Sequence, residues 1–365
     1  MRTAYKDLVN PPVLSQPIYE PGKPIEMVAA EYGLNPNEVA KLASNESALG
    51  PSPMAISAIQ ETASSVHLYP DGNATFLRQT LSKKWDLNPD QFIFGNGSNE
   101  VLELIARAFL SPGTEAIIGE YGFIVYKLVT LLHGATPVPI AMPQYKHDLK
   151  AMHAAITEKT RLIFIASPNN PTGVPDAPDE IITFALSLPD HVILVFDEAY
   201  AEYVDNAVNL RTLIAEGRKI LCTRTFSKIY GLGGLRLGYG YGDAELVQLL
   251  NRIREPFNVN LLALAASEAA LHDQAFLAEA RAANETGKSF LADGLHSLGL
   301  KVAPSATNFV LVEIDDPVGK FTALQKRGLV VRPLAPYGLL NHLRITIGTA
   351  DENERLLANL AELLQ

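Results

Sequence analysis

Reactive side chains recur directly after short apolar runs in the middle of this 365-residue chain. Asp197 follows one such run, and Thr225, Ser227 and Lys228 follow the next. A lysine amine can attack a carbonyl or carry a proton, and a carboxylate can hold a positive charge in place during a reaction. Taken singly, each residue has an ordinary interpretation as an ion-pairing or solvated group. Their recurrence at equivalent places predicts a site for amine chemistry.

Two earlier segments follow apolar runs in the same way. Gly97 and Ser98 precede an amphipathic helix, as a tight turn with a helix cap or as a phosphate site at a helix N-terminus would. Residues 167–173, Ser-Pro-Asn-Asn-Pro-Thr-Gly, favour a turn, and Asn169 lies in their centre. Glu120-Tyr121-Gly122 follows a further run and places an aromatic ring there.

These segments meet only if the apolar runs form one sheet. Strands separated by helices predict a mostly parallel sheet covered on both faces, and ligands gather at the carboxyl ends of such strands. The sequence therefore predicts an α/β fold in which the polar segments share one sheet edge. The strands are expected at 91–94, 116–119, 162–166, 192–196, 219–223 and 235–239, with helices such as 99–110 and 179–188 between them.

The pattern divides the chain into three regions. A proline-rich N-terminal arm (1–44) precedes a large domain (45–258), and a smaller α/β C-terminal domain (259–365) follows, which the arm helps to complete. The last region is expected to hold a helical stretch at 261–298 broken near Asp273, strands at 308–313, 328–332 and 343–347, and a closing helix at 351–364.

Bulk composition limits the function classes. Hydrophobic residues make up 47% and charged residues 19%, as in compact globular proteins, and the net charge of −10 argues against a nucleic-acid partner. The single cysteine, Cys222, is expected to be a buried strand residue and excludes an internal disulfide. We expect no membrane span, no signal peptide and a cytoplasmic protein. The eight histidines show no ligand spacing, so no metal site is expected.

The segment 223–238, Thr-Arg-Thr-Phe-Ser-Lys-Ile-Tyr-Gly-Leu-Gly-Gly-Leu-Arg-Leu-Gly, resembles the lysine segment of the class I/II, fold-type I aminotransferases. Segments 167–173 and 197–200 match two further motifs of that family, and the similarity runs nearly end to end. The resemblance implies a pyridoxal 5'-phosphate (PLP) enzyme with a large sheet domain and a smaller C-terminal domain.

The resemblance also implies roles around the cofactor ring. Lys228 would carry PLP as a Schiff base and, once freed by the substrate amine, would move the proton. Asp197 would hold the pyridine nitrogen protonated, which makes the ring an electron sink. Asn169 and Tyr200 would hydrogen-bond the phenolic oxygen, and Tyr121 would stack on the ring.

The same comparison assigns the cofactor phosphate. Gly97 and Ser98 would supply backbone donors at a helix N-terminus, Thr225 or Ser227 a hydroxyl, and Arg236 a positive charge. Glu100 and Glu103, which follow on the same helix, must point away from this phosphate.

Several segments resemble one subgroup, the histidinol-phosphate aminotransferases. That likeness implies transfer of the amino group of L-histidinol phosphate to 2-oxoglutarate, which gives imidazole acetol phosphate and L-glutamate in histidine biosynthesis. It also implies an obligate homodimer, because Tyr69 would reach the cofactor phosphate of the partner subunit. The segments are 42–46, 69–73, 99–104, 331–334 and 343–349.

Substrate recognition is assigned by the same likeness. Arg344 would bind the α-carboxylate of glutamate or the phosphate of histidinol phosphate, since a planar guanidinium accepts either anion. Arg332 would be a second phosphate anchor, and Asn45 and Tyr19 would line the pocket. Arg344 on an alternating strand could instead make a surface ion pair, and Tyr19 could simply pack in the arm.

Departures from the subgroup keep other activities open. Ser47-Ala48 replaces the usual Asn-Pro close to the expected pocket, and Gly233 replaces a more common alanine. An aromatic amino acid aminotransferase is therefore an alternative, and a PLP-dependent lyase such as a threonine-phosphate decarboxylase shares most of the motifs. A non-catalytic regulator is disfavoured, because the reactive residues are retained and no basic patch or DNA-binding extension is evident.

Overall fold

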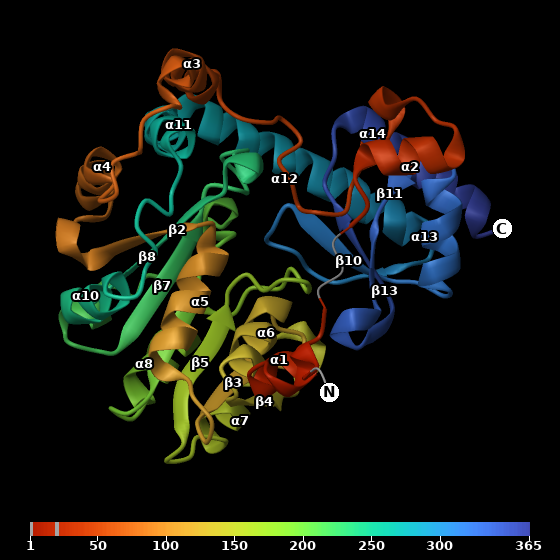
Figure 1. Cartoon of the computed structure of the whole chain (residues 1–365). Helices are drawn as coiled ribbons and strands as arrows, with labels where there is room; N and C mark the ends of the chain where they lie inside the picture. The colour runs from red at the N-terminus through yellow and green to blue at the C-terminus, as the bar shows by residue number, and fades with distance from the viewer. Residues whose placement is uncertain (1–2, 19–21) are drawn as a thin grey trace.

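A seven-stranded sheet forms the larger part of the molecule in the computed structural model, which describes residues 3–18 and 22–365 (Figure 1). Its strand order is β2-β8-β7-β6-β5-β3-β4, and only β8 runs antiparallel to its neighbours. The predicted mostly parallel sheet is therefore confirmed. The strands are β2 (Phe92–Asn96), β3 (Glu115–Gly119), β4 (Thr136–Ile140), β5 (Thr160–Ala166), β6 (Ile193–Asp197), β7 (Ile220–Thr225) and β8 (Leu237–Gly242).

Helices cover both faces of this sheet, as the apolar strands require. Ile163 and Ile165 of β5 belong to one hydrophobic core, and the alternating Leu162 and Phe164 belong to another. The second core is closed by α5 (Ser98–Phe109), α6 (Ile124–Leu132) and α10 (Ala244–Asn251). The first is closed by α4 (Thr75–Trp85), α8 (Pro178–Ser187) and α11 (Leu261–His272). Cys222 is fully buried between the strands, as predicted.

A smaller antiparallel sheet forms the second part of the chain, with the order β12-β13-β10-β9. The N-terminal arm contributes β1, which pairs in parallel with β11, so the arm completes this part. The elements are β1 (Ala40–Lys41), β9 (Lys301–Val302), β10 (Phe309–Glu313), β11 (Leu329–Val330), β12 (Arg332–Leu334), β13 (Leu339–Thr346), α13 (Pro317–Gln325) and α14 (Ala350–Leu363).

The long helix α12 (Gln274–Ser297) joins the two parts (Figure 1). Ala280 packs in the core of the large sheet, whereas Leu291 and Leu295 pack in the core of the small one. The predicted break before it lies at Asp273, whose carboxylate accepts a hydrogen bond from the Phe276 backbone N–H and caps the helix. The domain boundary at residue 258 remains a prediction. Helix α11, which follows this residue, packs on the large sheet.

Strand β4 and helix α13 were not anticipated from the sequence. Pro137 and Pro139 interrupt β4, and proline is tolerated there because this strand lies at the edge of the sheet. None of the helices in the described ranges is long and apolar enough to cross a membrane. The remaining helices are α1 (Pro11–Ser15), α2 (Ile25–Tyr32), α3 (Pro53–Thr62), α7 (Leu149–Ala154) and α9 (Arg211–Ala215).

Candidate active site

A cavity of about 150 Å³ lies at the carboxyl ends of β5, β6 and β7. The strands end there in polar groups, so the parallel topology brings together segments far apart in the sequence, as predicted. The lining residues are Ser98, Asn99, Phe123, Tyr126, Ala166, Pro168, Asn170, Asp197, Ala199, Tyr200, Thr225, Ser227, Lys228 and Arg236.

Asp197 ends β6 and is 4% exposed. Its Oδ2 accepts a 2.8 Å hydrogen bond from the Tyr126 hydroxyl, and its Oδ1 accepts one of 3.1 Å from the Ala199 backbone N–H. Burial raises the pKa of Asp197, and these hydrogen bonds oppose the rise. A buried carboxylate of this kind favours a cationic partner in the cavity.

Lys228 follows β7, and its amine faces the same cavity. Nζ lies 3.4 Å from the Ser44 carbonyl oxygen and 5.7 Å from the centre of the Tyr200 ring. Burial lowers the pKa of Lys228 to about 8, and the positive charge of Arg344 acts in the same direction. A substantial fraction of the amine is therefore neutral near physiological pH, which nucleophilic attack requires.

Tyr200 is buried between the two parts of the chain. Its hydroxyl accepts a 2.8 Å hydrogen bond from Asn45 Nδ2, and burial raises the pKa of Tyr200 to about 12, so the phenol stays protonated. Asn45 adopts φ 57° and is also bonded through its backbone N–H to the Thr346 hydroxyl. Asn45 thus joins the arm, β13 and Tyr200 behind the cavity wall, and it does not line the cofactor-sized cavity itself.

The N-terminus of α5 and the Arg236 guanidinium form one end of the cavity. Ser98 is the first residue of α5 and follows Gly97, which has φ 80°. A Cβ added to Gly97 would lie 2.5 Å from Arg236 Nη2, so a side chain at this positive-φ position would strain the backbone and push the guanidinium aside. Backbone N–H groups, the helix dipole and a guanidinium together favour a phosphate.

Other residues near this end agree with the expectation. Thr225 and Ser227 line the cavity, and the Ser227 backbone N–H donates to the Thr225 hydroxyl. Glu100 is turned away, since its carboxylate accepts hydrogen bonds from the Asn96 backbone and from Asn258. Glu103 pairs with His133 at 2.8 Å. Neither carboxylate opposes an anion in the cavity.

Asn169 does not reach the cavity, and its neighbour Asn170 does. Asn169 is completely buried, and its Nδ2 donates to the Tyr121 carbonyl and the Thr172 hydroxyl, both at 3.0 Å. These two bonds hold the turn together, and the buried Oδ1 of Asn169 has no hydrogen-bond partner among the described residues. Asn170 lines the cavity and accepts a 2.6 Å hydrogen bond from Arg344 Nη1. Of the two adjacent asparagines, Asn170 and not the predicted Asn169 lines the cavity in this structure.

Tyr121 does not line this cavity, and its stacking on the cofactor ring remains a prediction. Its ring packs 6.4 Å from the ring of Tyr145 and against the small-sheet core residues, whereas Phe123 lines the cavity. Tyr126 lies three residues further along and joins the cavity from the same side. Residues three apart share a helix face, and this spacing could have revealed the pair Phe123 and Tyr126.

Arg344 and Arg332 lie opposite each other on neighbouring strands of the small sheet. Arg344 is 7% exposed, and besides Asn170 it binds the Ala43 carbonyl at 2.6 Å, so it is not a surface ion-pair residue. Arg332 is half-buried and lines a neighbouring cavity of about 480 Å³ together with Lys23, Lys127 and Tyr337. Arg344 thus contacts a residue that lines the cofactor-sized cavity, whereas Arg332, its partner across the two strands, lines a different cavity.

Two predicted residues lie apart from this assembly. Tyr69 is 83% exposed, and its ring stacks on Phe257 at 5.0 Å. Its proposed contact with a partner subunit remains a prediction. Tyr19 lies outside the described residues. Within residues 3–18 and 22–365, no group of three or more His, Cys, Asp or Glu side chains could hold a metal ion.

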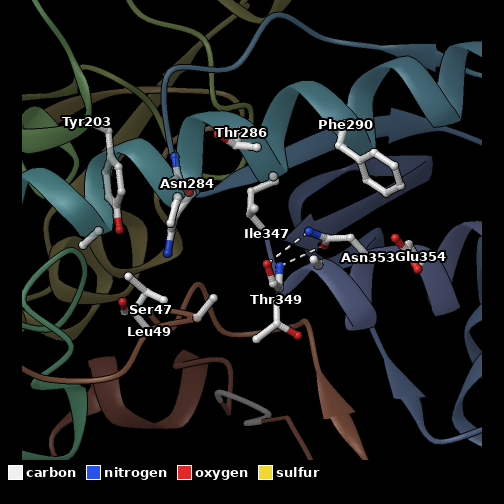
Figure 2. Close-up of a pocket in the computed structure, with 17 residues that line it drawn as sticks. Ser47, Leu49, Tyr203, Asn284, Thr286, Phe290, Ile347, Thr349, Asn353 and Glu354 are labelled. Carbon is white, nitrogen blue, oxygen red and sulfur yellow. Dashed lines mark hydrogen bonds between the residues drawn. The ribbon is translucent and has the colours of Figure 1, made fainter.

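A separate cavity of about 430 Å³ lies between α12, the start of α14 and residues 47–49 (Figure 2). Its described lining contains no lysine or arginine, so it does not suit a phosphate. Ser47 and Ala48 line this cavity and not the cofactor-sized one, although the sequence placed them close to the substrate pocket.

Comparison with known proteins gives a consistent family assignment. Residues 37–360 match the family model "Aminotransferase class I and II". The chain is 47% identical to histidinol-phosphate aminotransferase 1 of Thiobacillus denitrificans, covering 95% of this chain and 91% of the relative. It is 46% identical to histidinol-phosphate aminotransferase of Methylobacillus flagellatus, covering 95% of each.

Solved structures agree with this assignment. Histidinol-phosphate aminotransferase from Sinorhizobium meliloti, crystallised with pyridoxal-5'-phosphate, superposes with a TM-score of 0.89 and 28% identity, covering 98% of this chain and 97% of that one. The family and fold predicted from the lysine segment are therefore confirmed. The chain belongs to the class I and II aminotransferases.

Proposed function

We propose that this protein is a PLP-dependent histidinol-phosphate aminotransferase that converts L-histidinol phosphate and 2-oxoglutarate to imidazole acetol phosphate and L-glutamate. The observation that carries this proposal is the common cavity of Lys228, Asp197 and the Arg236 end of α5. The similarity to histidinol-phosphate aminotransferases over nearly the whole chain supports the choice of substrate.

The residues of the cavity fit PLP in charge and in shape. A phosphate matches the α5 N-terminus and Arg236, whose guanidinium occupies the space that a side chain at position 97 would need. A protonated pyridine nitrogen matches the buried carboxylate of Asp197. The neutral fraction of the Lys228 amine suits the aldehyde. Phe123 offers an apolar face to the ring.

When bound, PLP supplies an aldehyde that captures amines and a ring that withdraws electrons from the substrate carbon. Asp197 would keep the proton on the ring nitrogen, and Tyr126 holds the carboxylate through its 2.8 Å hydrogen bond. Asn170 and Tyr200 are the residues we assign to the phenolic oxygen. Lys228, with its lowered pKa, would move the proton between the substrate carbon and the cofactor carbon.

Two arginines would recognise the anionic ends of the substrates. Arg344 lies next to Asn170, so an anion bound by Arg344 is held beside the reacting groups. We assign it the glutamate carboxylate and, in the other half-reaction, the substrate phosphate. Arg332, directly opposite it on β12, is the second phosphate anchor. Asn45 acts through Tyr200.

The proposal includes a homodimer. Tyr69 and Phe257 are 83% and 48% exposed although they stack on each other, and burial against a second copy would remove this apolar surface from water. Tyr69 would reach the cofactor phosphate of the partner subunit. A cytoplasmic location stays a prediction.

A panel of amino donors tests the substrate assignment. Specificity constants for histidinol phosphate, phenylalanine and tyrosine should be measured with 2-oxoglutarate as acceptor. Histidinol phosphate should exceed the aromatic amino acids by at least tenfold, because only it carries a phosphate for Arg332. A preference for phenylalanine or tyrosine would contradict the assignment. Failure of glutamate to convert the bound cofactor to its amine form would contradict transamination itself.

A further inference from the structure

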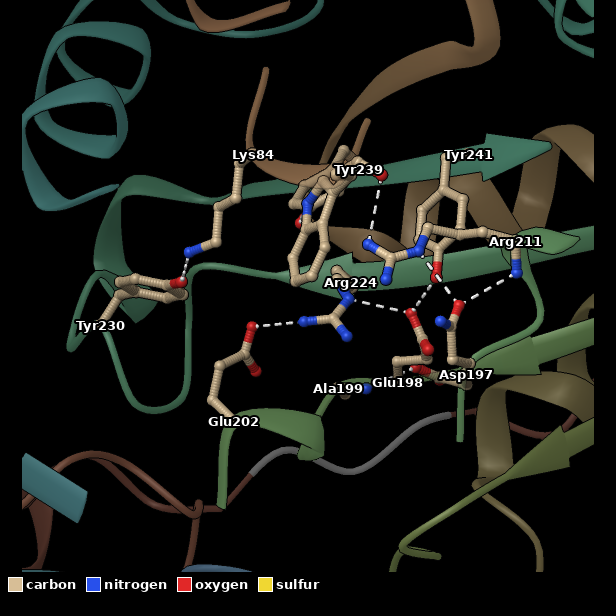
Figure 3. Close-up of polar contacts among 12 residues, drawn as sticks. Lys84, Asp197, Glu198, Ala199, Glu202, Arg211, Arg224, Tyr230, Tyr239 and Tyr241 are labelled. Carbon is tan, nitrogen blue, oxygen red and sulfur yellow. Dashed lines mark hydrogen bonds and ion pairs between the residues drawn. The ribbon is translucent and has the colours of Figure 1, made fainter. Parts of the chain in front are cut away.

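A buried network of charges lies behind the candidate active site, on the opposite side of β6 and β7 (Figure 3). Successive residues of a strand point to opposite faces of a sheet. Asp197 faces the cavity, and the adjacent Glu198 faces away from it. In the same way, Thr225 faces the cavity and the adjacent Arg224 faces away from it. The network is therefore attached to the same strand ends that carry the reactive groups.

Arg224 is the centre of this network. Its Nε donates to Glu198 Oε2 and its Nη1 donates to Glu202 Oε1, both at 2.8 Å. Glu198 Oε2 also accepts a 2.7 Å hydrogen bond from the Tyr241 hydroxyl. The Trp85 ring covers the guanidinium at 4.2 Å, and its Nε1 donates to the Tyr239 hydroxyl. Burial alone would lower the pKa of Arg224, but Glu198 and Glu202 raise it well above its ordinary value.

The two carboxylates bracket a short turn. The turn of residues 197–202 begins at the last residue of β6. Its acidic residue Asp197 and its aromatic residue Tyr200 both line the cavity. Glu198 and Glu202 belong to the same turn and bind one guanidinium on β7. The Glu198 backbone N–H also donates to the Thr223 carbonyl at 2.8 Å. The turn is thus fixed from behind at both of its ends.

Stability alone does not account for such a network. Buried ion pairs seldom stabilise a protein more than apolar residues of the same volume, because the charges lose their hydration. A fixed geometry is what the two-point binding does supply. The strand that contains Arg224 also leads to Lys228, so the network connects the turn that carries Asp197 and Tyr200 with the segment that carries the reactive amine.

We propose that Arg224 is a positioning residue of the enzyme: through Glu198 and Glu202 it fixes the turn from which Asp197 and Tyr200 face the cofactor. This inference rests on the proposed PLP chemistry. It predicts that loosening the network impairs the reaction of bound substrate more than the binding of substrate or the folding of the chain.

The test compares Arg224→Lys, Glu198→Gln and Glu202→Gln with Arg211→Met. Arg211 lies 5.2 Å from the Trp85 ring and binds Asn209, so it shares the aromatic partner without binding the 197–202 turn. For each holoenzyme we would measure kcat, KM, the melting temperature and the pH midpoint of the visible absorbance of bound PLP.

Network variants should lower kcat by roughly 10- to 100-fold, since small displacements of reacting groups have effects of this size. KM should change less than kcat, and the absorbance midpoint should shift. Arg211→Met should leave kcat and the midpoint unchanged. Glu202→Gln removes the charge without changing the size of the side chain, at the more exposed end of the network. It keeps the test valid if Arg224→Lys does not fold.

Folded network variants with wild-type kcat and an unshifted midpoint would overturn the proposal, as would an equal loss in Arg211→Met. The proposed function is tested separately by the wild-type protein. If that protein shows no visible absorbance with PLP and no transamination, the proposed function fails. If it shows both and the network variants match it, only the positioning role fails.

Discussion

The ionisable groups on the two faces of strands β6 and β7 differ in how fully they are paired with opposite charges. Behind the sheet, Arg224 meets two carboxylates at hydrogen-bond distance, and Trp85 covers it. In front, Lys228 and Asp197 share a cavity without an ion pair between them. Burial lowers the pKa of Lys228 and raises the pKa of Asp197, so it favours the neutral form of each group. A saturated network gives rigidity, whereas incompletely paired groups are available to a ligand.

Asp197→Asn should cause the largest loss of activity among the changes on the two faces. The amide keeps the size of the side chain but cannot hold a proton on the cofactor nitrogen, so kcat/KM should fall by roughly 100- to 1000-fold. Steady-state kinetics at saturating PLP would measure it. The matched change behind the sheet, Glu198→Gln, should cost less. An equal or larger loss in Glu198→Gln would contradict the division between reacting and positioning faces.

Arg344→Ala should lower the rate of both half-reactions by roughly 100-fold, because both substrates lose a charge-assisted anchor. Arg332→Ala should weaken histidinol phosphate selectively, with little change for glutamate. Single-turnover absorbance changes with each donor would separate the two effects. If Arg344→Ala impaired only the glutamate half-reaction, the shared-anchor assignment would be wrong.

The pH dependence of cofactor attachment reports the protonation of Lys228 on the front face. Because the pKa of Lys228 is lowered to about 8, the fraction of Lys228 with a neutral amine increases roughly tenfold per pH unit below pH 8 and levels off above it. The rate at which apoprotein gains the visible PLP absorbance should follow this curve. Binding of pyridoxamine phosphate, which forms no bond to lysine, is the control. A rate that keeps rising to about pH 10 would show an ordinary lysine.

The adjacent asparagines give the smallest expected effects and the sharpest contrast. Asn170→Ala should lower kcat/KM by roughly tenfold through loss of one hydrogen bond at the cavity. Asn169→Ala should instead lower the free energy of unfolding by about 1–3 kcal/mol, because its buried amide bonds the Tyr121 carbonyl and Thr172. Kinetics and chemical denaturation of both variants decide between them. A larger kinetic loss in Asn169→Ala would reverse our assignment.

The sequence predicted the site at the level of strand ends and missed details at the level of single side chains. Asp197, Lys228 and Arg236 lie where the apolar runs placed them, because a parallel sheet brings its carboxyl ends to one edge. Asn169 and Tyr121 do not line the cavity, because neighbouring residues of a turn point in different directions and turn composition does not encode those directions.

Other features depend on contacts between distant residues. The network around Arg224 joins positions 85, 198, 202, 224 and 241, which no local pattern relates. Strand β4 was missed because Pro137 and Pro139 are unfavourable except at a sheet edge. The likeness to a family supplied the cofactor and the substrate, which the strand pattern alone could not name.

Reduction of the holoenzyme with borohydride followed by peptide mass spectrometry tests directly whether PLP is bound to Lys228. Reduction makes the bond between PLP and its lysine permanent, so the modified peptide identifies the residue. We predict one equivalent of reduced PLP on the peptide that contains Lys228 and none on Lys228→Ala. Modification of a different lysine, or no modification of the wild-type protein, would contradict the claim.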